Sequence, residues 1–281
     1  MKPLSIKKAA SFIIKILILT FILFISYPLS SPILDMAPIS GGSPVLPLLL
    51  MSLLITLVMS NVIVHSKWTG YKLFLGITMI FFTVSTFLSQ IETVVFLRYL
   101  KDIIPPVLIP RLFLQGVFIT ALFSLSAVTI YGKMRKIDQR FADERPFVFQ
   151  KTMLFKIFLV SIIYVIIYFS FGMFVFMPLA GDAVVDYYGN LQLPVWIIPF
   201  QLVRGIIWGT VALTILRMMK GGLPVKAISV ALVFSVLMGS LLLIPNDFMP
   251  DTVRYAHLVE VSSSNFLFGL ISGWILERNA S

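Results

Sequence analysis

Long apolar runs constrain the fold of this chain more than any other feature. Eight of them follow one another at short intervals, and most exceed the roughly 18 residues that a helix needs to cross a bilayer. Only 12% of the 281 residues are charged, whereas a soluble domain carries roughly 25%. The runs do not alternate polar and apolar residues, as the strands of an outer-membrane barrel do. The sequence therefore predicts an all-α, polytopic helical membrane protein.

The runs define eight transmembrane helices in a single domain of residues 1–281. We expect these helices at about residues 9–30, 45–64, 72–96, 107–131, 152–177, 195–218, 224–244 and 252–276. A cleaved signal peptide is the alternative for the first run, but the run is longer than the usual 7–15 residues and contains Lys15. We therefore expect it to be retained as a span. The connections are too short to fold as soluble domains, so the function should lie within the spans.

Charge alternates between successive connections, which predicts the topology. One set is basic: the N-terminus, residues 65–72, 133–156 and 217–226, and the C-terminal tail. The other set is acidic or balanced, and includes Asp35, Asp182, Asp186, Asp247 and Asp251. The positive-inside rule then places both termini in the cytosol of a plasma membrane, and we expect a bacterial inner membrane. The net charge of +10 is explained by this topology and not by nucleic-acid binding.

The last span, in residues 254–274, carries more polar groups than lipid can solvate. At about 100° per residue, His257, Glu260 and Ser264 fall within one arc about 60° wide. Such groups must face other protein or water. A neighbouring seam of small residues, expected to serve helix packing, consists of Asn265, Gly269 and Gly273.

Three other spans carry polar stripes at a similar depth. The stripes are Thr78, Ser85, Ser89 and Glu92 in the third span, Arg111 and Gln115 in the fourth, and Gln201, Arg204, Gly205 and Trp208 in the sixth. An ionised side chain at the bilayer centre costs at least about 2.5–3.5 kcal/mol, so such groups are expected to share one pocket. We expect this pocket near the outer surface, with Arg204 paired to Glu260 or Glu92 and oriented by Gln201 and Asn265. Its predicted ligand-binding residues are Glu92, Gln115, Gln201, Arg204, His257, Glu260 and Asn265.

Several plainer interpretations stand beside this one. Glu92 and Arg111 lie near the interface and can extend their charges to water. An Arg204–Glu260 pair can serve only to fix the helix register. A metal site would use His257 and Glu260, three residues apart, with Glu92. The pocket offers no second histidine and the chain has no cysteine, so we expect neither a metal nor another cofactor.

The sequence favours a protein that binds or transports a polar or anionic small molecule, or a lipid headgroup. Arg204 would be the partner of the anion, and His257 with Glu260 the titratable pair. The alternatives are a membrane-embedded hydrolase or transferase acting on a lipid-linked substrate, and a non-catalytic scaffold subunit. In the enzyme, His257 or Glu260 would be the catalytic general base, while Arg204 and Asn265 would stabilise negative charge. Membrane lipids are the expected partners in every case.

Overall fold

The computed structural model describes residues 6–35, 43–100, 104–135, 151–189 and 193–277. Within these ranges the chain forms helices and no strand, apart from one isolated bridge between Ser66 and Met219. The helices are α1 (Ile6–Leu34), α2 (Val45–Val64), α3 (Gly70–Phe82), η1 (Thr83–Phe87), α4 (Leu88–Leu100), α5 (Leu108–Ile130), α6 (Lys151–Phe171), η3 (Gly172–Phe176), α7 (Met177–Ala180), α8 (Ala183–Tyr188), α9 (Ile197–Met218), α10 (Leu223–Gly239), η4 (Ser240–Leu243) and α11 (Asp251–Glu277).

Among the described residues, eight helical segments are long and apolar enough to cross a membrane, which confirms the predicted multi-pass, all-α class. Five of them are the single helices α1, α2, α5, α9 and α11. The third span joins α3, η1 and α4, the fifth joins α6, η3 and α7, and the seventh joins α10 and η4. Both η1 and η3 are π-helical turns. Such a turn inserts one extra residue and rotates everything after it by about 100° about the helix axis.

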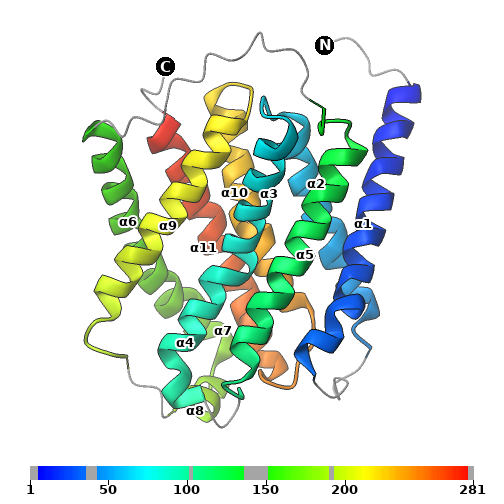
Figure 1. The fold of residues 1–281 in the computed structure, drawn as a ribbon. Helices are drawn as coiled ribbons and strands as arrows, with labels where there is room; N and C mark the ends of the chain where they lie inside the picture. Colours follow the sequence, from blue (N-terminus) through cyan, green and yellow to red (C-terminus); the bar gives the residue numbers. More distant parts are fainter. Residues whose placement is uncertain (1–5, 36–42, 101–103, 136–150, 190–192, 278–281) are drawn as a thin grey trace.

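The beginning of α1 and the end of α11 lie at the same end of the bundle (Figure 1), as an even number of spans requires. The short helix α8 lies at the opposite end, together with the end of α4 (Figure 1). We call the half of the bundle that contains α8, α4 and the starts of α9 and α11 the distal half. Which side of a membrane it faces stays a prediction from the charges of the connections.

The helices α10 and α11 pack closely along the small residues of α11. A Cβ atom on Gly269 would lie 2.7 Å from Cα of Ala231, and one on Gly273 would lie 2.7 Å from Cα of Ala227. Side chains larger than hydrogen would therefore collide with the backbone of α10. The packing role predicted for this seam is confirmed at both glycines.

An aromatic cluster fills the centre of the bundle, farther from the distal end than the polar residues of the distal half. Trp208 of α9 is fully buried, and its ring centroid lies 4.4 Å from that of Phe234 and 6.2 Å from that of Phe268. Tyr164 of α6 meets Phe268 edge-to-face at 5.1 Å. These contacts tie α6, α9, α10 and α11 together, one helical turn from Arg204.

Candidate functional site

Arg204 is a deeply buried charge of the distal half, with only 2% of its side chain exposed. Its Nη2 atom lies 2.8 Å from Oε2 of Glu92 and donates a second hydrogen bond to the carbonyl oxygen of Leu88 at 3.2 Å. Its Nη1 atom donates to Oε1 of Gln201 at 2.9 Å. The Nε group is buried and has no hydrogen-bond partner among the described residues. The guanidinium thus joins α9 to α4 through both its charge and its hydrogen bonds.

Three aromatic rings surround this guanidinium. Its Cζ atom lies 5.8 Å from the ring centroids of Tyr164 and Phe200 and 5.9 Å from that of Tyr168. The Tyr168 hydroxyl also donates a 2.7 Å hydrogen bond to Oε1 of Glu92, so both carboxylate oxygens are engaged. The Glu92 side chain is nevertheless 27% exposed. The ion pair is therefore closed on the arginine side and open on the glutamate side.

A close approach of α9 to α6 brings these aromatic rings to Arg204. A Cβ atom on Gly205 would lie 2.7 Å from Cα of Ser161, so the two helices touch backbone to backbone there. Tyr164 and Tyr168 follow Ser161 by about one and two turns along α6. Glycine at position 205 thus sets the distance between the arginine and its aromatic surroundings.

His257 and Glu260 form a second polar group on α11. His257 Nδ1 lies 3.3 Å from Oε2 of Glu260, and its Nε2 lies 3.0 Å from the hydroxyl of Tyr188 on α8. The imidazole stacks on Phe176 of η3, with ring centroids 4.0 Å apart and planes 15° from parallel. One face and both nitrogens of the histidine therefore have partners, drawn from three segments of the chain.

Tyr188 keeps its proton in this group. Burial raises the pKa of Tyr188 well above its ordinary value, and the nearby Tyr187, Glu92 and Glu260 raise it further. A phenol with its proton can donate to Nε2 or accept from it, depending on the tautomer of the imidazole. In either case the three side chains form a hydrogen-bonded chain from Tyr188 through His257 to Glu260.

The two groups occupy one level of the bundle. Counting 1.5 Å per residue from the distal ends of α9, α4 and α11, Arg204, Glu92 and Glu260 all lie about 10–14 Å deep. The charges of Glu92 and Glu260 both act on Tyr188, which places the two groups within electrostatic reach of each other. Of the predicted residues, Glu92, Gln201 and Arg204 lie in the first group and His257 and Glu260 in the second, while a shared pocket for a ligand stays a prediction.

The predicted partnership was right in part. Arg204 pairs with Glu92 and is oriented by Gln201, as expected. The alternative pair with Glu260 is not formed, because Glu260 is engaged by His257 on its own helix face. Asn265 does not orient the arginine either, since its Nδ2 atom lies 3.5 Å from Sδ of Met238 on α10.

Two residues of the fourth span also lie apart from the ion pair. Gln115 donates from Nε2 to the hydroxyl of Ser30 on α1 at 3.1 Å. Arg111 lies 3.2 Å from Oδ2 of Asp35, and these side chains are 33% and 79% exposed, as expected for an arginine that reaches the interface. Ligand binding by any of the predicted residues stays a prediction.

Sequence reasoning missed Tyr168, Phe176 and Tyr188. The residues around Tyr188 were expected to form an acidic connecting loop, but residues 183–188 form the helix α8. Tyr187 and Tyr188 pack onto an apolar cluster that contains Phe176, Val253 and Ala256. The available signal was the pair of adjacent tyrosines in an otherwise short and polar connection.

In the described part of the chain, no set of three or more His, Cys, Asp or Glu side chains is arranged to hold a metal ion. Comparison of the chain with protein-family models, with curated proteins and with solved structures finds no match in any of the three.

Proposed function

We propose that this integral membrane protein binds and transports a small anion, or the anionic headgroup of a lipid, and couples its movement to protons. The Arg204–Glu92 pair supports the proposal above all other observations. The arginine is buried and held by three aromatic rings, whereas its carboxylate partner is partly exposed. An anion that approaches from the side of Glu92 would compete with that carboxylate for the guanidinium.

The competition links anion binding to proton uptake. Protonation of Glu92 would leave Arg204 as an unpaired buried cation, which is strongly unfavourable. An incoming anion would restore the pairing, so proton and anion favour each other's binding by the same factor. The protein would thus take up the anion together with about one proton per site.

The chain from Tyr188 through His257 to Glu260 supports a path for that proton. Tyr188 lies outside the predicted spans on α8, and Glu260 lies about two and a half turns inside α11. A histidine with a partner at each nitrogen can accept a proton at one and release it from the other. This chain would carry protons between the distal surface and the level of the ion pair.

The test is uptake by the purified protein reconstituted in lipid vesicles. Phosphate, acetate and succinate serve as anionic probes, and fluorescent phosphatidylglycerol tests the headgroup. Wild-type protein should move at least one probe faster at mildly acidic than at neutral pH. Arg204→Ala should abolish this movement, and Glu92→Gln should remove its dependence on pH.

The exposed Arg111 provides the matched control, since Arg111→Gln removes an arginine that also pairs with a carboxylate. This variant should behave as wild type. Unchanged transport in both Arg204→Ala and Glu260→Gln proteins that insert normally would refute the proposal.

A membrane-embedded enzyme acting on a lipid-linked substrate is the second candidate. A hydroxyl, an imidazole and a carboxylate in hydrogen-bonded order form the arrangement that activates a nucleophile. The raised pKa of Tyr188 makes its phenol a poor nucleophile, which favours transport. Release of a product from labelled membrane lipid, lost in His257→Ala, would favour the enzyme instead.

A non-catalytic scaffold would keep its function when Arg204, Glu260 and Glu92 are all replaced by neutral residues of similar size.

A further inference from the structure

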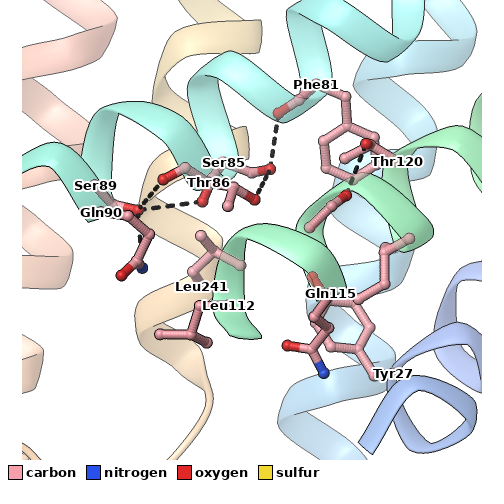
Figure 2. A pocket seen from close by; sticks show the side chains of 12 residues that line it. Tyr27, Phe81, Ser85, Thr86, Ser89, Gln90, Leu112, Gln115, Thr120 and Leu241 are labelled. Atoms are coloured by element: carbon pink, nitrogen blue, oxygen red, sulfur yellow. Dashed lines mark hydrogen bonds between the residues drawn. The ribbon is translucent and has the colours of Figure 1, made fainter. Parts of the chain in front are cut away.

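A second polar region lies on the other side of the third span. A cavity of about 180 Å³ lies between four parts of the chain (Figure 2). These are α1, α5, η4, and the segment formed by η1 and the start of α4. Its polar lining includes Ser85, Thr86, Ser89, Gln90, Gln115 and Thr120. Arg204, Glu92, His257 and Glu260 do not line it. The cavity is therefore distinct from the site described above.

Three hydroxyls of this lining donate their protons to backbone carbonyl groups. Ser85 donates to the carbonyl oxygen of Phe81 at 2.7 Å, and Ser89 donates to that of Thr86 at 3.0 Å. Thr120 donates to the carbonyl oxygen of Gly116 at 2.7 Å. A hydroxyl has one proton and two lone pairs, so each of these oxygens keeps acceptor capacity.

The two amides of the lining each donate a hydrogen bond from Nε2 to a serine hydroxyl. Gln115 donates from Nε2 to Ser30, and Gln90 donates from Nε2 to the hydroxyl of Ser89 at 3.5 Å. These hydrogen bonds place the amide nitrogen of each glutamine against a protein hydroxyl. The carbonyl oxygen of each side chain takes no part in them. Gln90 Oε1 is buried and accepts from no donor among the described residues. Figure 2 shows the two side chains on different helices, Gln90 on α4 and Gln115 on α5.

The rest of the wall is apolar and includes Phe81, Leu112 and Ile119, while its polar part offers acceptor oxygens and carries no ionised side chain. Divalent cations such as calcium and magnesium are normally bound through carboxylates, and none is present here. Neutral oxygens of hydroxyls and carbonyls bind monovalent cations in membrane proteins, often where a spanning helix is irregular. The π turn η1, which contributes Ser85 and Thr86, is such an irregularity.

We propose that this cavity binds a monovalent metal cation, sodium or potassium, with part of its hydration shell. At about 30 Å³ per water molecule, the cavity has room for an ion and several waters. The ligands are the oxygens of Ser85, Ser89, Thr120 and the Gln115 side chain. The site stands independently of anion transport, since it shares no side chain with the Arg204 ion pair.

The experiment measures thermal unfolding of the full-length protein in detergent micelles by tryptophan fluorescence. Sodium or potassium chloride replaces choline chloride at constant ionic strength. A binding site gives a rise in Tm that saturates with sodium or potassium and is absent with choline. Methylammonium chloride is the further probe, because it offers N–H donors without a metal ion.

Thr120→Val and Thr129→Val form a matched pair of variants on α5. Both hydroxyls donate to a backbone carbonyl four residues earlier at 2.7 Å, but Thr129 is exposed and lies away from the cavity. Thr120→Val should raise the apparent Kd of the cation about tenfold, the effect of one lost ligand oxygen to a charge. Thr129→Val should leave it unchanged. Ser89→Ala provides a second variant with the same expected increase if Thr120→Val does not fold.

Three outcomes would overturn the proposal. Equal curves in sodium, potassium and choline would mean that the cavity holds water alone. Saturable stabilisation by methylammonium without any by sodium or potassium would assign it to an organic amine. Wild-type cation affinity in Ser89→Ala, or in a folded Thr120→Val protein, would place the cation elsewhere.

Discussion

Replacing Glu92 by glutamine tests the energetics of the buried ion pair. The change removes the charge 2.8 Å from Arg204 but keeps an oxygen that can accept from Tyr168. Removing one partner of a buried pair costs about 3–5 kcal/mol, because the remaining charge is left uncompensated. Glu92 is 27% exposed, so the protein does not fully enclose its side of the pair. We therefore expect the lower limit, a loss of about 3 kcal/mol in the free energy of unfolding.

A double-mutant cycle separates this loss from other effects of the substitution. Arg204→Met removes the arginine charge, and the double variant Glu92→Gln/Arg204→Met leaves no buried charge at this contact. The double variant should lose less than the sum of the single losses, with a coupling of at least about 2 kcal/mol. Unfolding in mixed micelles, followed by circular dichroism against the fraction of denaturing detergent, provides the free energies.

The pair formed by Arg111 and Asp35 is the control for the cycle. Its side chains are 33% and 79% exposed, so its coupling should lie below about 1 kcal/mol. A coupling below about 0.5 kcal/mol for Arg204 and Glu92 would mean that the two charges act independently. Both the buried pair and the competition proposed for anion binding would then be refuted.

Three further predictions concern other parts of the chain. Gly205→Ala should lower the free energy of unfolding by about 1–3 kcal/mol, because the added Cβ would lie 2.7 Å from Cα of Ser161. Gly221→Ala should cost about 1–3 kcal/mol in the same assay, since φ is +120° there, whereas Gly222→Ala should change little because its Cβ meets only one atom, at 3.9 Å. Burial and the nearby charge of another lysine lower the pKa of Lys133 from 10.5 to about 8, so competitive acetylation should show half-maximal reactivity near that pH. Because the unfolded chain keeps this proton up to 10.5, stability should rise between about pH 8 and 10.5; a plateau throughout would contradict the shift.

The positions of the spans could be predicted because the bilayer sets the length and composition of a spanning helix. The predicted span at residues 45–64 coincides with α2 (Val45–Val64). The other spans differ mainly at their ends, where helix formation is decided by local hydrogen bonds and not by hydrophobicity. Gly269 and Gly273 of the last span were also informative, since a seam of small residues on a spanning helix predicts close packing.

The internal geometry of the third span could not be predicted in the same way. A uniform period of 3.6 residues places Ser85, Ser89 and Glu92 on one face. In the structure Ser85 and Ser89 line the cavity, while Glu92 reaches Arg204. The π turn η1 ends at Phe87, so it shifts Ser89 and Glu92 together relative to Ser85, and no residue type requires such a turn. The third span thus carries polar groups on two sides, which a uniform period does not predict.

The choice of partner for Arg204 follows from the difference between local and remote contacts. Two carboxylates lie at its depth, and depth alone cannot distinguish them. Glu260, however, lies three residues after His257, a spacing that brings two side chains together on any helix, whatever its neighbours do. The local contact forms with α11 itself, so Glu260 is already engaged when the bundle assembles. Glu92 has no charged partner on its own helix among the described side chains, and it is the carboxylate that crosses to α9. When a buried charge has several candidate partners, those with a partner on their own helix should be set aside first.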